Sequence, residues 1–214
     1  MQQIDAAAIE TFGIPRLLLM EHAGLAVARA AHTLMPTPSA PILICCGSGF
    51  NGGDGLAAAR HLHEWGYPLR LLVTGRLSDL REEPATYATI LQQLGLSLAE
   101  VTDLQALSQV ERVVEECGLV IDALLGLGAC GPVREPARSL IACLNRSDKP
   151  VVAVDLPSGL DGDTGLPQGI AVRATMTVTF GLPKQGCLRG EGPAHVGRMV
   201  VDSITIPRAL LERS

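Results

Sequence analysis

The feature that most constrains the fold is a series of short apolar runs separated by longer amphipathic stretches. Each run is nearly continuous in hydrophobicity, rich in β-branched side chains and bounded by Gly or Pro, as is typical of buried parallel strands. Strands are expected at 41–46, 69–75, 119–126, 151–156 and 175–182, with a further one at 198–204. Helices are expected at 15–35, 55–65, 84–94, 103–116 and 135–145.

This alternation predicts an α/β fold, with an open, mostly parallel sheet covered by helices on both faces, which makes three layers. A chain of 214 residues can form one such domain around a large core, and no internal repeat divides it. We therefore expect a single domain over 1–214. Two long polar segments, 157–165 and 181–192, are expected to be functional loops because compact domains rarely contain long loops without a role.

Charge and composition disfavour several classes of protein. The chain has 17 basic and 22 acidic residues, a net charge of −5, and no Lys/Arg-rich run, so a small molecule is a better partner than nucleic acid. No stretch approaches the roughly 18 apolar residues of a membrane helix, and the N-terminus does not have the pattern of a signal peptide. The six cysteines form no C-x-x-C motif, so free thiols and a cytoplasmic location are expected.

Polar residues follow four of the predicted strands at their carboxyl ends, where open α/β sheets bind ligands. The first strand leads into GSGFNGGDG (47–55), whose glycines let backbone N–H groups approach a phosphate at the start of a helix. Asp122 lies late in the third run, Asp155 lies at the end of the fourth with Ser158 after it, and Lys184 follows the fifth. We expect these groups to converge on one ligand site.

Two acids in this set have more than one interpretation. Asp54 can act as the N-cap of the following helix or contact the ligand, and the glycines around it favour ligand contact. Asp122 lies in an apolar run, where a carboxylate must be paired, protonated or metal-bound. No Arg or Lys stands beside Asp122 in the sequence, so a cation is expected. Oxygen ligands from Asn, Asp and Ser suit an alkali or alkaline-earth ion rather than zinc.

The letters GSGFNG match G-x-G-x-x-G, the fingerprint of dinucleotide-binding dehydrogenases. That motif requires an acid at the end of the second strand to hold the ribose hydroxyls. Here Arg76 follows the second predicted strand and the first acid is Asp79, beyond the turn. Since an Arg can hold a 2′-phosphate, an NADP-dependent oxidoreductase is one alternative. A Walker loop is excluded because no G-K-[ST] follows.

The chain resembles the NAD(P)H-hydrate epimerases, the YjeF N-terminal domain family, in five segments that follow one another in order. They are LLLMEHAG (17–24), GSGFNGGDGLAAARHL (47–62), VIDALLGLGACGPVREP (120–136), VVAVDLPSGLDGDTG (151–165) and TVTFGLPKQG (177–186). The resemblance implies a Rossmann-like fold, one potassium ion per subunit and a homodimer. It also implies epimerisation of hydrated NADH or NADPH at nicotinamide carbon 6, so that a separate S-specific dehydratase can restore the cofactor. The dinucleotide is then the substrate, not the coenzyme.

The same resemblance implies the site residues. Its two substrate loops fall on Phe50, Asn51, Gly52, Gly53 and Asp54, and on Gly126, Leu127, Gly128, Ala129, Cys130, Gly131 and Pro132. Asp155 is implied as a further substrate contact, and Asn51, Asp122 and Ser158 are implied as the potassium ligands. Phe50 replaces the first Asn of the usual loop, Leu127 stands where Thr is common, and Thr175 stands where Asp often precedes the last strand.

Epimerisation at carbon 6 suggests a mechanism. Loss of hydroxide leaves an iminium-like cation, and water can return to either face of the ring. The enzyme then needs an acid, a base and negative charge near the cation. Asp155 and Asp54 are the candidate catalytic residues, and Lys184 is a further candidate. A nucleotide-binding or partner-binding member of the family without catalysis is the second alternative.

Overall fold

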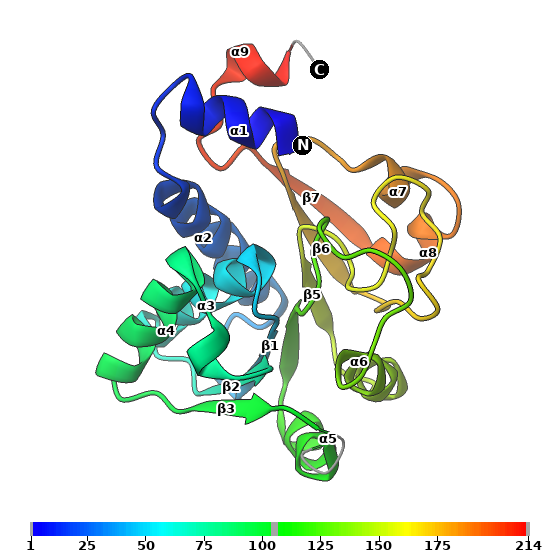
Figure 1. Ribbon diagram of the computed structural model, residues 1–214. Helices are drawn as coiled ribbons and strands as arrows, with labels where there is room; N and C mark the ends of the chain where they lie inside the picture. Colours follow the sequence, from blue (N-terminus) through cyan, green and yellow to red (C-terminus); the bar gives the residue numbers. More distant parts are fainter. Residues whose placement is uncertain (1, 104–106, 213–214) are drawn as a thin grey trace.

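The computed structural model describes residues 2–103 and 107–212, and within them seven strands form one parallel sheet (Figure 1). The strand order is β3-β2-β1-β4-β5-β6-β7. The strands are β1 (Ile42–Cys46), β2 (Leu69–Thr74), β3 (Leu98–Val101), β4 (Leu119–Ala123), β5 (Val151–Val154), β6 (Met176–Phe180) and β7 (Arg198–Asp202).

Helices cover both faces of this sheet. They are α1 (Gln2–Glu10), α2 (Arg16–Leu34), α3 (Phe50–Glu64), α4 (Glu82–Gln93), α5 (Leu107–Glu116), α6 (Ala137–Arg146), α7 (Gln185–Leu188), α8 (Gly192–Val196) and α9 (Arg208–Leu211). Side chains of β1 alternate between the two faces: Ile42 and Ile44 pack in one apolar cluster with α2, α3 and α4, whereas Leu43 and Cys45 pack in another with α5 and α6. The expected three-layer, Rossmann-like α/β fold is therefore confirmed.

The strand order creates a switch point between β1 and β4. From β1 the chain adds β2 and β3 on one side of the sheet, and then returns to add β4 to β7 on the other. The loops that leave β1 and β4 therefore diverge, which opens a crevice at their carboxyl ends. The Gly47 N–H donates to Ala123 O at 2.9 Å. A Cβ at Gly47 would lie 3.0 Å from the Leu124 carbonyl carbon, so glycine permits this close approach.

The predicted strands and helices are found near their expected positions, with several differences. Strand β3 was not predicted because it is an edge strand with Ala99 and Glu100 exposed, so it has no continuous apolar run. Helix α3 begins at Phe50, so the prediction of a helix from Gly55 is wrong; most of the glycine-rich segment is itself helical. The predicted loop 181–192 contains α7, and α1 was not predicted. Part of the helix predicted at 103–116 lies outside the described residues.

Two further expectations concern the cysteines and the membrane-spanning potential of the helices. The six cysteines are free; Cys130 is exposed and the other five are buried. Among the helices of the described residues, none combines the length and apolar character needed to cross a bilayer.

Candidate functional site

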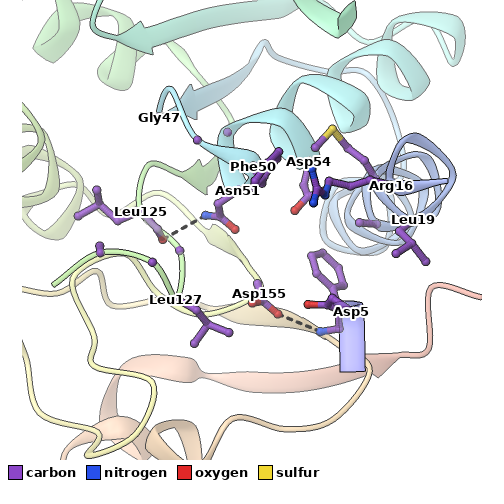
Figure 2. Close-up of a pocket in the computed structure, with 18 of the residues that line it drawn as sticks. Asp5, Arg16, Leu19, Gly47, Phe50, Asn51, Asp54, Leu125, Leu127 and Asp155 are labelled. Carbon is purple, nitrogen blue, oxygen red and sulfur yellow. Dashed lines mark hydrogen bonds between the residues drawn. The ribbon is translucent and has the colours of Figure 1, made fainter. Parts of the chain in front are cut away.

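A cavity of about 770 Å³ lies at the carboxyl edge of the sheet, across the switch point (Figure 2). This volume falls within the range of small-molecule sites. Its walls come from the loops after β1, β4, β5 and β6, and from α1 and α2. The residues that line it include Asp5, Ile9, Arg16, Leu19, Met20, Ala23, Gly47, Ser48, Gly49, Phe50, Asn51, Gly52, Asp54, Thr74, Leu124, Leu125, Gly126, Leu127, Gly128, Ala129, Asp155, Phe180, Lys184 and Ile204.

The first turn of α3 forms one wall of the cavity. Gly49 is its N-cap residue, and the N–H groups of the first helical residues have no acceptor within the helix, which makes this end suited to an anion. A Cβ at Gly52 would lie 2.7 Å from the carbonyl carbon of Gly47 and closer still to its oxygen. Only glycine lets the helix start this close to the end of β1, so the glycine at 52 fixes the wall of the site.

A buried polar cluster lies beneath this wall. The Asp122 carboxylate is fully buried and accepts hydrogen bonds from Ser158 Oγ at 2.6 Å and from the Ser158 N–H at 2.8 Å. Ser158 Oγ accepts a hydrogen bond from the Leu125 N–H at 2.9 Å, and Asn51 Nδ2 donates to Leu125 O at 3.1 Å. Asn51, Asp122 and Ser158 are thus gathered around one backbone segment.

The chemistry of this cluster fits a hard cation. No ion pair among the described residues involves Asp122, and its hydrogen-bond donors are neutral. Burial raises the pKa of Asp122 to about 6 while the hydrogen bonds from Ser158 oppose the rise. Carboxylate, hydroxyl, amide and carbonyl oxygens are ligands of hard cations, and the described residues contain no His/Cys/Asp/Glu group suited to a transition metal.

Asp155 and Lys184 form an ion pair on the opposite side of the cavity (Figure 2). Lys184 Nζ donates to Asp155 Oδ1 and, at 2.9 Å, to Phe180 O; the Phe180 N–H donates to Asp155 Oδ1 at 3.1 Å. Asp155 has a φ of 66°, which is uncommon for a residue other than glycine. Strained backbone of this kind collects at functional sites, and here it carries a carboxylate held in one orientation.

Asp54 lies in the second turn of α3, so its interpretation as the helix N-cap is wrong. It lines the cavity, and burial followed by the negative charge of Asp155 raises its pKa well above the ordinary value. Asp5, on α1, is in a similar position: burial and then the charge of Asp155 raise its pKa, while Lys184 lowers it. The cavity therefore brings together three carboxyl groups that influence one another.

The rim of the cavity carries an aromatic side chain. The Phe50 ring is 47% exposed, and the Arg16 guanidinium carbon lies 4.5 Å from its centroid. Arg16 Nη1 also lies 3.0 Å from Glu82 Oε2. Phe50, which stands where the family usually has Asn, therefore forms a cation–π pair with Arg16 at the entrance of the cavity.

Most of the residues expected at the site lie around the cavity, but not all of them line it. Gly53 does not line the cavity, and a Cβ there would meet the side chains of Met20 and Pro84. Cys130, Gly131 and Pro132 lie beyond the lining part of their loop, and Asp122 and Ser158 lie in the buried cluster below. The two predicted substrate loops approach each other closely, because a Cβ built at Gly126 would lie 3.0 Å from Asn51 Cβ.

Sequence reasoning did not identify Asp5 and Arg16 as cavity residues. Both residues precede the first predicted strand, whereas the predicted site comprises residues at the carboxyl ends of strands. The available signal was the spacing of Ile4 and Ala8, which identifies the buried face of a helix and leaves Asp5 beside it.

Comparisons with known proteins agree with this geometry. The sequence model described as "YjeF-related protein N-terminus" matches residues 16–186. The chain is 37% identical over 223 residues to the "Bifunctional NAD(P)H-hydrate repair enzyme Nnr" of Salinibacter ruber, covering 100% of this chain and 41% of that protein. It is 38% identical over 201 residues to the "NAD(P)H-hydrate epimerase" of Limosilactobacillus fermentum, covering 94% of this chain and 92% of that protein.

A solved structure shows the same fold. The crystal structure of the yeast protein ynu0 superimposes with a TM-score of 0.86 and 25% sequence identity, over 99% of this chain and 89% of that one. The chain spans about two fifths of the length of the bifunctional relatives, with 41% of the Salinibacter ruber protein covered. The family match extends over most of the sequence and includes the loops that build the cavity from β1, β4, β5 and β6. The chain belongs to the YjeF-related protein N-terminus family.

Proposed function

We propose that this chain is an NAD(P)H-hydrate epimerase, which interconverts the R and S forms of hydrated NADH and NADPH at nicotinamide carbon 6. The observation that carries the proposal is the meeting, in one cavity, of the α3 N-terminus and the carboxyl groups of Asp54 and Asp155. The first suits a pyrophosphate and the second suits proton transfer. The Limosilactobacillus fermentum relative, which has nearly the same length as the matched region, bears this name.

The proposed substrate contacts are the two loops at the switch point and Asp155. The first comprises Phe50 to Asp54, with its backbone N–H groups directed to the phosphates, and the second comprises Gly126 to Pro132. Asp155 and Asp54 are the proposed acid–base groups. Lys184 holds Asp155 by an ion pair and remains a further candidate for proton transfer. A fixed carboxylate near the ring would also stabilise the cationic intermediate.

The residues present fit the potassium ion that the family resemblance implies. Asn51, Asp122 and Ser158 would hold it, because they supply oxygens around a buried carboxylate that pairs with no cationic side chain in the described ranges 2–103 and 107–212. When bound, the ion would compensate the Asp122 charge and tie the loops after β1, β4 and β5 together. The proton transfers belong to the carboxyl groups of the cavity.

Several properties of the working enzyme follow from this proposal. Its product would feed an S-specific dehydratase, and the bifunctional relatives are named for NAD(P)H-hydrate repair. We further propose a single domain over 1–214, a homodimer and a cytoplasmic location, with no nucleic-acid or membrane partner. Sedimentation equilibrium tests the homodimer.

One coupled assay tests the function. A mixture of R and S hydrates is incubated with an S-specific dehydratase until the S form is consumed, and the protein is then added. The expected result is consumption of the remaining R form with recovery of reduced cofactor, faster than spontaneous epimerisation. Unchanged R hydrate alongside tight binding of the dinucleotide would indicate a binding protein without catalysis. An absorbance change with NADP and a second substrate, in the absence of hydrate, would indicate an oxidoreductase.

A further inference from the structure

Asp5 brings a carboxyl group into the cavity from outside the strand-end loops. It lies on α1, before the region 16–186 that the family model matches, and Figure 2 shows it near Asp155, the partner of Lys184 in an ion pair. Asp5 is in the first turn of α1, where a negative charge favours the helix, but its side chain is only partly exposed and α1 gains its packing from other positions.

The position of Asp5 is fixed by the packing of α1. Ile4 and Ala8, four residues apart on one face of the helix, are buried in the same apolar cluster as Ile204 and Ile206 of the C-terminal segment. Figure 1 shows α1 lying beside α9 at the end of the chain. Because both neighbours on its buried face are anchored, the helix holds the Asp5 carboxyl at the cavity wall.

The charges around Asp5 leave its carboxyl available for chemistry. Burial and the charge of Asp155 raise its pKa, the charges of Lys184, the N-terminal amino group and Arg16 lower it, and its own charge raises the pKa of Asp54 in turn. Lys184 is paired with Asp155, and Arg16 with Glu82. In the described part of the chain, no hydrogen bond or ion pair is found for the Asp5 carboxyl. Three carboxyl groups therefore share one buried ammonium, and mutual repulsion favours a proton held between Asp5 and Asp54, the two that have no ion pair among the described residues.

We propose that Asp5 is a proton-transfer group of the epimerisation, working with Asp54 while Asp155 provides the fixed negative charge; this rests on the proposed function. The reaction needs an acid, a base and a stabilising charge, and the three partly buried carboxyl groups of the cavity can supply one each, whereas the fourth lining acid, Glu10, is exposed. Asp155 is held by Lys184 and by the Phe180 N–H, so it is the group suited to the fixed charge.

The step balances in both directions. Protonated Asp5 gives its proton to the hydroxyl on carbon 6; the C–O bond breaks with its electron pair going to oxygen, water leaves, and the ring nitrogen lone pair forms C=N. Water then attacks carbon 6 from the other face, its proton passes to ionised Asp54, and the C=N pair returns to nitrogen. In the opposite epimerisation the two groups exchange roles, as reversibility requires. Proton exchange with solvent restores the starting state.

Asp5→Asn tests this assignment, with Asp148→Asn as the matched control. Asp148 is an exposed acid just before β5, at the opposite edge of the sheet, and its substitution removes the same charge. In the coupled assay we expect Asp5→Asn to lower kcat about 100-fold, the lower end of the range for general acid–base catalysis, with KM changed less than about threefold. The alkaline limb of the kcat profile should also move. Asp148→Asn should match the wild type.

The outcomes separate this inference from the proposed function. If the wild type is active and Asp5→Asn has the same kcat and pH profile as Asp148→Asn, the role of Asp5 is overturned and the proposed function stands. A wild type without epimerase activity would overturn both. If the melting curve shows that Asp5→Asn does not fold, Asp5→Glu is measured instead. A shift of the alkaline limb of its kcat–pH profile supports proton transfer by residue 5, and a limb at the wild-type position refutes it.

Discussion

The three glycines at 49, 52 and 53 give a test of how the site wall is built. Each is replaced by Ala in turn. A Cβ at Gly49 would meet no atom within 4 Å. A Cβ at Gly53 would lie 2.6 Å from Met20 Cε, the end of a flexible side chain. A Cβ at Gly52 would lie 2.7 Å from the carbonyl carbon and 2.9 Å from the nitrogen of Gly47, which are backbone atoms that cannot rotate away.

The expected magnitudes follow from two opposing effects. Within a helix, Ala is favoured over Gly by about 1 kcal/mol, so Gly52→Ala would stabilise α3 if space allowed. Overpacking costs about 1–3 kcal/mol, and a clash with backbone belongs at the upper end of that range. We therefore expect a net loss of about 2 kcal/mol for Gly52→Ala, or a melting temperature lower by about 4–8 °C. Gly49→Ala should lose less, about 0.5–1 kcal/mol, because Ala is a poorer N-cap than Gly but meets no atom there, and Gly53→Ala should lie between them.

Thermal and urea denaturation of the three variants measure these values, and the coupled assay measures activity. Because the first turn of α3 must move away from the end of β1, Gly52→Ala should also lose about 100-fold in kcat, as small displacements of catalytic groups do. A Gly52→Ala variant at least as stable as the wild type would refute the close approach of Gly52 to Gly47. Equal losses at Gly49 and Gly52 would show that helix capping, not space, decides the sequence of this loop.

Three further predictions concern the polar groups. Lys184→Met leaves the Asp155 carboxylate without its buried cation, and urea denaturation should show a loss of about 3 kcal/mol. Asp54 has a pKa raised above its ordinary 3.8, so its ionisation opposes folding as pH rises; stability should be greatest at low pH and fall above 3.8. Asp54→Asn, which cannot ionise, should therefore gain on the wild type by up to about 1.4 kcal/mol per pH unit until the folded-state pKa is passed, measured by urea denaturation at pH 5, 6 and 7. Potassium at 100 times its dissociation constant should add about 2.7 kcal/mol, measured by melting in KCl against choline chloride, and Ser158→Ala should abolish this response.

The sheet could be predicted because its central strands are buried on both faces. Residues such as Leu43 and Ile44 are both inaccessible to solvent, so their strand has an unbroken apolar run. Edge strand β3 gives no such signal, because Glu100 is exposed. The start of α3 was misplaced because four of the six residues before Gly55 are glycines or Asn, which local propensity assigns to a loop. Packing against β1 overrides that propensity.

The position of a residue relative to the strands decides whether the sequence could predict it as part of the candidate site. Asp122 lies near the end of β4, and Asp155 and Lys184 follow β5 and β6; in a parallel sheet every strand ends at the same edge, so sequence position alone predicts their approximate place. Asp5 is carried to that edge by the burial of Ile4 and Ala8 against the C-terminal segment. The local spacing of Ile4 and Ala8 identifies the buried face of α1 but not its place in the fold, since Ile204 and Ile206 lie almost the full chain length away.

The two parts of the cavity therefore depend on different forces. The loops after β1 and β4 are held by backbone proximity, with the Gly47 N–H bonded to Ala123 O and little space for any side chain. The wall that carries Asp5 is held by the apolar contacts of a short helix at the chain terminus, which open more readily than a central sheet does. The proposed phosphate-binding loop and the buried carboxylate therefore belong to the more rigid part of the site, and the proposed proton donor Asp5 belongs to the part with the lower free energy of local opening. A proton donor placed there exchanges protons with solvent more easily between turnovers, which suits a reaction in which water must leave and return at one carbon.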